Sequence, residues 1–196
     1  MTNFIKRTIS GIGFAAIMLA ALLTNKYIFG VVMLFALVVM MREFLRMTCG
    51  KNYWFSQILS ILAGATLFTL IYLYKGFNFP GRLVILAFVP VFMLMINSLY
   101  VKDKSRFDKF SNLYTAILYI AVPWSLLNFA VFNGCGDFSG MLLLCFFAVI
   151  WGTDVGAYMF GITLGQKYGK KLFPSISPKK SWIGFWGGLF VAILVA

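Results

Sequence analysis

Seven apolar runs, separated by short polar segments, account for most of the chain. They cover residues 8–24, 28–41, 55–74, 83–100, 113–132, 140–165 and 182–196. A helix needs about 20 apolar residues to cross a bilayer, and a backbone in lipid must form its hydrogen bonds internally. We therefore predict an all-α polytopic membrane protein with about seven transmembrane helices, in which Pro90 and Pro123 kink the fourth and fifth.

The composition agrees with this class, since 62% of the residues are hydrophobic and only 11% are charged. The net charge of +12 could suggest a nucleic-acid partner. Basic cytoplasmic loops of a membrane protein explain it better, so the predicted partner is the lipid bilayer and not nucleic acid. The absence of histidine excludes catalysis by Ser-His-Asp or Cys-His groups, and the three cysteines show no CxxC spacing.

The basic residues are distributed unevenly between alternate loops. Of the seventeen Lys and Arg residues, fourteen lie in the N-terminal segment and in the second, fourth and sixth loops. The other loops hold only Lys26, Lys75 and Arg82. The positive-inside rule therefore predicts a cytoplasmic N-terminus and places the "SPKK" sequence on the cytoplasmic face.

The "SPKK" sequence precedes the seventh apolar run. Ser177 is a suitable N-cap and Pro178 a suitable first helical residue, which would put Lys179 and Lys180 in the first turn. Cations are unfavourable there because the helix dipole is positive at this end, whereas a bound phosphate would make them favourable. The alternative, a plain positive-inside anchor for the helix, remains open at this point.

Asp154 lies inside the sixth apolar run, where a carboxylate is costly and usually faces a cavity or a partner. Asp154, Ala157, Tyr158, Gly161 and Gly165 fall on one helical stripe, whose small residues would let another helix approach closely. The alternative is a buried aspartate that pairs with a lysine for structure. The loop that follows carries Lys167, Lys170 and Lys171 and would attract anionic lipid headgroups.

Two segments together, "WGTDVGAYMFGITLG" and "ISPKKSWIGFWGG", resemble the phosphatidate cytidylyltransferase (CDP-diacylglycerol synthase) family. The matching positions are Asp154, Ala157, Tyr158, Gly161, Gly165, Ser177, Pro178, Lys179, Lys180, Gly184, Gly187 and Gly188. Ser181 replaces the family's usual Thr, and Ile183 stands where the family usually has Glu. The family's aspartate-rich, metal-binding signature would lie beyond the position of Ala196.

The resemblance implies an enzyme that joins CTP to phosphatidate. Catalytic roles fall to Asp154, which would also ligate Mg²⁺, and to Lys179 and Lys180. The implied substrate-binding residues are Ser177, Pro178, Ser181, Tyr158, Lys170 and Lys171. It also implies a multi-pass protein of the inner (plasma) membrane with a cytoplasmic active face, and leaves a homodimer open. Two alternatives remain, a CTP-dependent polyprenol or lipid kinase and a transporter that uses Asp154 as an intramembrane charge.

We divide the chain into N-terminal transmembrane helices, residues 1–139, and the start of a catalytic region, residues 140–196. One carboxylate is too few for a metal-dependent phosphoryl-transfer site. We therefore expect these 196 residues to be an incomplete chain that is inactive alone when the transfer of labelled CTP into lipid is measured. Robust turnover by them would contradict this expectation.

Overall fold

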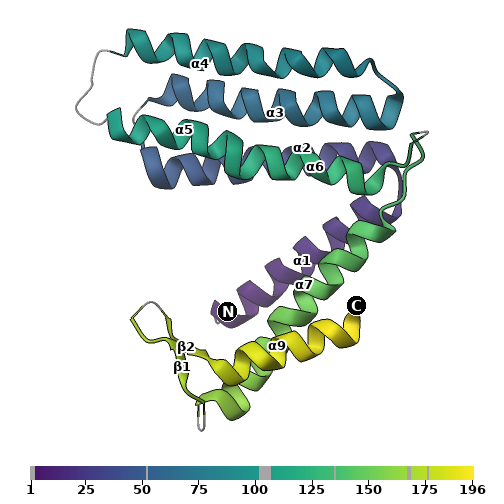
Figure 1. Ribbon diagram of the computed structural model, residues 1–196, viewed down its shortest axis with the longest axis vertical. Helices are drawn as coiled ribbons and strands as arrows, with labels where there is room; N and C mark the ends of the chain where they lie inside the picture. The colour runs from purple at the N-terminus through teal and green to yellow at the C-terminus, as the bar shows by residue number, and fades with distance from the viewer. Residues whose placement is uncertain (1–2, 52, 102–106, 135, 167–168, 176) are drawn as a thin grey trace. The chain divides into compact units, whose positions relative to one another are not determined.

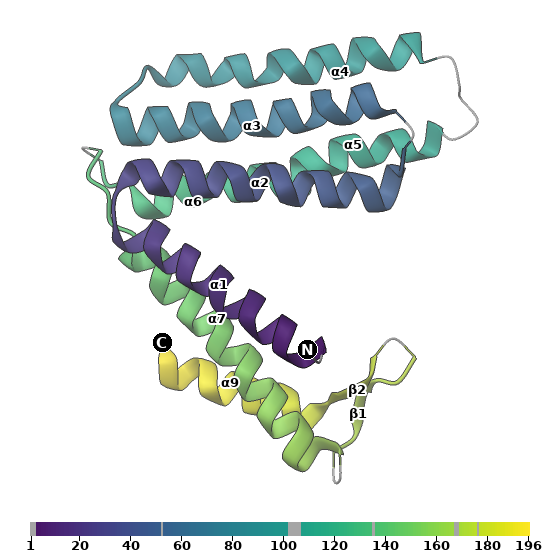
Figure 2. The same ribbon diagram turned by 180° about the vertical axis from the view of Figure 1, so that it is seen from behind.

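The computed structural model describes residues 3–51, 53–101, 107–134, 136–166, 169–175 and 177–196. The chain folds into two compact units, Met1–Gly140 and Met141–Ala196, and Figures 1 and 2 show the helices of each. Each unit is described by itself below.

The first unit is entirely helical apart from its connections. Its α-helices are α1 (Asn3–Leu23), α2 (Lys26–Cys49), α3 (Trp54–Phe77), α4 (Phe88–Tyr100), α5 (Ser111–Ala116) and α6 (Val122–Val131). A 3₁₀ segment, Gly81–Ala87, leads into α4, a 3₁₀ turn, Phe107–Phe110, leads into α5, and a π-helical segment, Ile117–Ala121, joins α5 to α6.

The second unit combines two helices with a short β-hairpin. Helix α7 (Met141–Phe160) continues into a π-helical segment, Gly161–Gly165. The strands β1 (Lys171–Phe173) and β2 (Ser177–Ser181) follow, and α9 (Trp182–Val195) ends the chain. The hairpin was not expected from the sequence, which predicted a basic loop followed, from Ser177, by the start of the last helix.

Five helical segments among the described residues are long and apolar enough to cross a membrane. They are Lys26–Cys49, Trp54–Phe77, Gly81–Tyr100, Ser111–Val131 and Met141–Gly165. Two shorter apolar helices, Gly13–Leu23 and Trp182–Val195, correspond to the first and last apolar runs. The prediction of an all-α polytopic membrane protein is therefore confirmed, whereas a total of seven spans and a cytoplasmic N-terminus remain predictions.

Helix α3 lies at the centre of the first unit, where it packs against α2, α4 and α6 (Figures 1 and 2). Helix α2 presents to this core a stripe of fully buried side chains, spaced four residues apart along the helix. They are Phe29, Met33, Leu37, Met41 and Leu45. This spacing keeps the side chains on one face of a helix, so the opposite face of α2 is left for lipid.

Polar side chains link the helices of this unit at several levels. The indole nitrogen of Trp124 in α6 donates to the carbonyl oxygen of Met33 in α2 at 2.9 Å. The hydroxyl of the fully buried Ser60 in α3 donates to the carbonyl oxygen of Leu113 in α5 at 2.8 Å. Such bonds help to orient helices in a bilayer, where the hydrophobic effect does not drive one helix against another.

Both prolines that the sequence placed within spans lie beside irregular helical turns. Pro123 has no N–H to offer the carbonyl four residues back, and it is the second residue of α6, after the π-helical segment Ile117–Ala121. There the Val122 N–H bonds the Ile117 carbonyl, five residues back, in the wider turn of a π-helix. Pro90 is the third residue of α4, just after the 3₁₀ segment that leads into this helix.

We predict that Trp124→Phe lowers the stability of the first unit by about 1 kcal/mol, because it removes the hydrogen bond to Met33 while keeping an aromatic ring. Heat denaturation of the protein in detergent, followed by fluorescence, measures the effect. Trp54→Phe is the matched control, since the Trp54 side chain is 67% exposed. Equal midpoints for both variants would show that the Trp124 bond contributes nothing.

Candidate functional site

The residues that the sequence singled out lie in the second unit, on α7, on the hairpin and at the start of α9. Helices α7 and α9 pack closely along their lengths. The contact is built from small residues: a Cβ atom added at Gly184 would lie 2.9 Å from the carbonyl oxygen of Ala157 and 3.2 Å from the Cα of Gly161. An added Cβ at Gly188 would lie 2.9 Å from the carbonyl oxygen of Thr153. The predicted close approach of a helix to the small residues of α7 is therefore confirmed.

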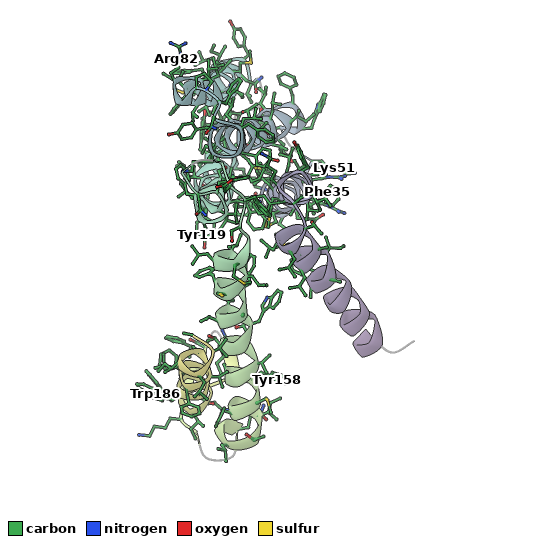
Figure 3. The ribbon with its side chains drawn as sticks, turned by 90° about the vertical axis from the view of Figure 1, so that its right-hand side faces the viewer. Phe35, Lys51, Arg82, Tyr119, Tyr158 and Trp186 are labelled. Atoms are coloured by element: carbon green, nitrogen blue, oxygen red, sulfur yellow. The ribbon has the colours of Figure 1, made fainter. Side chains whose placement is uncertain are left out.

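Asp154 and Tyr158 lie beside this contact and not within it. Both side chains are exposed, Tyr158 to 69%, and Figure 3 shows Tyr158 pointing away from α9. The prediction that they share the helix-contact face is thus wrong, because α9 packs against a neighbouring face of α7 that includes Thr153, Ala157 and Phe160. The alternative of an aspartate buried for structure does not hold either, since the Asp154 side chain is exposed.

The predicted start of the last helix is also wrong. Ser177 is not its N-cap, and Lys179 and Lys180 are not in its first turn, because Ser177–Ser181 forms strand β2. The N-cap is Ser181, whose backbone is extended (φ −126°, ψ 156°) and whose hydroxyl accepts a hydrogen bond from the Gly184 N–H at 3.2 Å. The argument from the helix dipole therefore does not apply to these lysines.

The sequence did contain the correct signal for the helix start. Ser181 stands immediately before the apolar run that begins at Trp182, which is where an N-cap is expected. The Ser-Pro pair at 177–178 offered a competing cap four residues earlier. Pairing with β1, with Lys171 opposite Ser181 and Phe173 opposite Ser177, holds the intervening residues in an extended conformation.

The hairpin is attached firmly to the end of α7. The Gly169 N–H bonds the carbonyl oxygen of Gly165 at 3.1 Å, and the Trp182 N–H bonds that of Lys170 at 3.0 Å. The buried Ser181 side chain lies against Gly165, where a Cβ atom would overlap its hydroxyl. The base of the hairpin is therefore fixed to the π-helical end of α7.

The structure places three predicted basic residues, Lys170, Lys171 and Lys180, with exposed side chains on this hairpin. The backbone of Pro178 and Lys179 belongs to β2. Their side chains lie outside the part of the chain that the structure describes, as does Lys167. Exposed lysines on a hairpin can bind a phosphate group without losing any protein hydrogen bond.

Asp154 and the hairpin base are separated along α7. Gly165 lies eleven residues after Asp154 in the chain. At a rise of 1.5 Å per residue, this separation is about 16 Å along the helix axis. That distance is too long for an ion pair between Asp154 and a lysine at the hairpin base, and it suits an extended ligand that reaches both. The exposed edge of α7 and the hairpin thus form a candidate site for a long, anionic molecule.

The donor set for a metal ion is small. No group of three or more His, Cys, Asp or Glu residues is found within the described parts of the chain. Mg²⁺ often binds through only one or two carboxylates, with water and substrate phosphates as the other ligands. The exposed Asp154 carboxylate fits that mode of binding, but it could not hold the ion without a phosphate-bearing substrate.

Comparison with known proteins identifies relatives of the whole chain. A family model described as "Cytidylyltransferase family" matches residues 5–196. The phosphatidate cytidylyltransferase of Bacillus subtilis (strain 168) is 27% identical over 197 residues, which cover 100% of this chain and 71% of the relative. No solved structure gives a significant match.

Two shorter matches are more similar to the chain. The phosphatidate cytidylyltransferase of Rickettsia bellii is 38% identical over 84 residues, 43% of this chain and 34% of the relative. That of Staphylococcus aureus (strain COL) is 35% identical over 88 residues, 45% of this chain and 33% of the relative. The matched region thus spans about a third of the length of these two proteins.

We predict that Gly184→Ala destabilises the second unit by about 1–3 kcal/mol, because the new methyl group would press on backbone atoms of α7 that cannot move aside. Thermal denaturation in detergent measures it. Gly13→Ala is the control, since a Cβ atom at Gly13 meets no other atom within 4 Å and alanine favours a helix. A stability of Gly184→Ala equal to that of the wild type would contradict the close contact.

Proposed function

The chain belongs to the cytidylyltransferase family, and on that premise we propose that the protein makes CDP-diacylglycerol from CTP and phosphatidate. The observation that carries the proposal is the family match over residues 5–196, together with a relative named phosphatidate cytidylyltransferase that aligns with the entire chain. The helical, multi-pass character of the protein supports it, because one of the two substrates is a membrane lipid.

In the proposed reaction, an oxygen of the phosphatidate phosphate attacks the α-phosphorus of CTP. A new P–O bond forms there, the bond between the α-phosphorus and the bridging oxygen breaks, and pyrophosphate leaves. The protein contributes mainly by holding two anionic substrates together and by neutralising charge that develops in the transition state.

The exposed lysines of the hairpin support the binding of phosphate groups. Lys170, Lys171 and Lys180 would each offer three N–H donors to CTP or to the lipid headgroup. We assign Lys179 the same role from the family resemblance. The proposed roles of Ser177 and Pro178 are to shape the strand beside these lysines, and that of Ser181 is to fix the strand to α9.

Asp154 and Tyr158 occupy the other part of the proposed site, on the exposed edge of α7. Asp154 would hold Mg²⁺ jointly with the CTP phosphates, and the ion would supply positive charge against the triphosphate. Tyr158, one turn further along the helix, would orient a substrate headgroup. In this arrangement the ligand bridges the distance between the carboxylate and the lysines.

The location of the site at a membrane surface follows from the same proposal. The headgroup of phosphatidate lies at the bilayer surface, and a basic hairpin would attract it electrostatically. We place this surface on the cytoplasmic side of the inner membrane because the basic loops of the chain lie predominantly on one side of the predicted topology.

Labelled nucleotides test the activity directly in membranes from cells that express the protein from its complete native gene. We expect label from the α-phosphate of CTP to enter a chloroform-soluble product, and label from the γ-phosphate to leave as pyrophosphate. Appearance of γ-label in lipid would identify a lipid kinase in place of the proposed enzyme.

We further predict that Lys180→Gln and Asp154→Asn each lower the rate by on the order of 100-fold, the usual cost of removing one group that stabilises the transition state. Lys51→Gln is the matched control, because Lys51 is an exposed lysine of the first unit that has no assigned role. An equal loss in all three variants would point to an effect of charge on expression or membrane insertion, and would contradict the assigned roles.

A further inference from the structure

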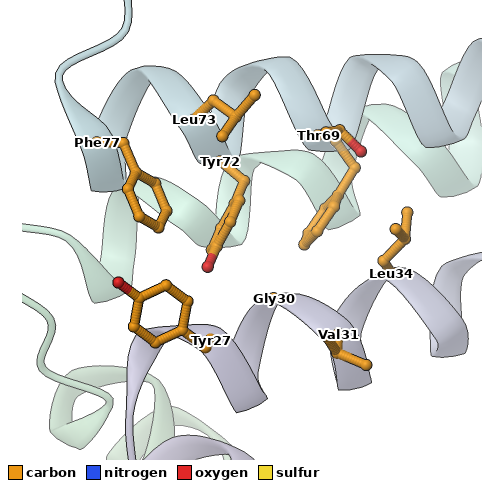
Figure 4. A pocket seen from close by; sticks show the side chains of 9 residues that line it. Tyr27, Gly30, Val31, Leu34, Thr69, Tyr72, Leu73 and Phe77 are labelled. Atoms are coloured by element: carbon orange, nitrogen blue, oxygen red, sulfur yellow. The ribbon is translucent and has the colours of Figure 1, made fainter.

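A groove runs between α2 and α3 in the first unit, with a cavity volume of about 280 Å³ (Figure 4). It is lined by Tyr27, Gly30 and Val31 of α2 and by Phe68, Tyr72 and Phe77 of α3, among others. Figure 4 shows the rings of Tyr27, Tyr72 and Phe77 gathered at one end. Its size approaches the lower limit for small-molecule sites, which is enough for part of one acyl chain.

The groove depends on a contact between a glycine and a tyrosine. A Cβ atom at Gly30 would lie 2.6 Å from the ring of Tyr72, so only glycine lets this ring rest on α2. The Tyr72 hydroxyl donates to the carbonyl oxygen of Lys26 at 2.8 Å, which fixes the ring. The groove is therefore preformed, and Tyr27 and Val31, both exposed on its α2 side, leave it open laterally.

A cation lies at the aromatic end of the groove. The Lys26 ammonium donates to the carbonyl oxygen of Gly76 at 3.2 Å. It lies 4.4 Å from the ring centroid of Phe77 and 5.9 Å from that of Tyr27. An ammonium group has three N–H donors and the Gly76 bond occupies one of them, so Lys26 can still donate to an anion.

Two more basic residues occur in the chain segments at this end of the first unit. Lys75 lies next to Gly76 in the chain, with its ammonium 5.0 Å from the ring centroid of Phe129, and Arg82 follows shortly after. The one carboxylate at this end among the described residues is Asp137, on the exposed loop after α6. Basic residues therefore outnumber acidic ones among the described residues at this end of the unit.

We propose that this groove binds one anionic phospholipid, with an acyl chain lying between α2 and α3 and the phosphate at Lys26. An apolar groove open to a bilayer is filled by lipid tails, because an empty one forfeits dispersion contacts and water would find no polar partners there. Lys26 then selects the headgroup. As an alternative, Lys26 would only cap the C-terminus of α3 and anchor the protein at the membrane interface. That role explains the lysine, but it does not explain the groove beside it.

The site is separate from the proposed reaction. It lies wholly in the first unit, and the charge distribution predicts Lys26, Lys75 and Arg82 on the opposite side of the membrane from the lysine hairpin. The bound lipid is therefore held and not converted, and the proposal does not depend on the proposed function.

Native mass spectrometry of the protein, taken from nanodiscs that contain equal amounts of phosphatidylglycerol and phosphatidylcholine, tests the proposal. We expect one retained phosphatidylglycerol per chain. Lys26→Gln should lower this retention about fivefold, the factor expected for one lysine that faces an anionic lipid. Lys26→Arg keeps the charge and should retain the lipid. Equal retention of both lipids by the wild type would overturn the proposal.

A second pair of variants tests the groove without altering Lys26. Val31→Trp fills the groove from an exposed position on α2, whereas Val39→Trp places the same ring on the same helix outside the groove. We expect loss of the retained phosphatidylglycerol in Val31→Trp and its persistence in Val39→Trp. Retention by Val31→Trp at the level of the wild type would show that the lipid binds elsewhere.

Discussion

The contact between α7 and α9 is the constraint on which the candidate site depends. Glycines on both helices let their backbones meet, and even the methyl group of an alanine would be too close to backbone atoms where Gly184 faces Ala157 and Gly161. This close approach brings Ser181 against Gly165 and so fixes the base of the hairpin to the end of α7. Asp154 lies outside this contact, with its side chain exposed.

The helices of the two units are held together by different kinds of contact. In the first unit, long side chains interdigitate around α3, and hydrogen bonds such as that from Trp124 to Met33 link the helices. In the second unit, backbone meets backbone and few large side chains are buried. A glycine-lined contact tolerates almost no change in volume, whereas a core of Phe, Met and Leu can repack. A catalytic site in the second unit, as proposed, would gain from the first property, because its groups must stay at fixed positions.

The sequence predicted the helices well because their signal is strong: long apolar runs, separated by short polar segments, are hard to mistake even where, as in the first and last runs, they are shorter than a bilayer requires. It also located Asp154 and Tyr158 on the helix where the structure has them, but it placed Lys179 and Lys180 in the first turn of the last helix and not on a strand. It failed where two local signals competed. Ser177 and Ser181 are both suitable caps, and only pairing with β1, a contact between separate segments, decides for Ser181. Helical periodicity likewise placed Asp154 on the same stripe as the glycines. Which residues of that stripe are covered depends on how α9 packs against α7, and the spacing of the residues does not show this.

Ser181 ends β2 and caps α9 at once, so no spacer residue separates the strand from the helix. The joint is consequently stiff: a rotation of α9 about its axis must swing the hairpin with it. Insertions at this joint would be poorly tolerated, whereas the turn near Pro174 and Ser175, exposed at the far end of the hairpin, can vary in length. Homologous chains should therefore differ in the reach of their hairpins and agree on how the hairpin meets the helix.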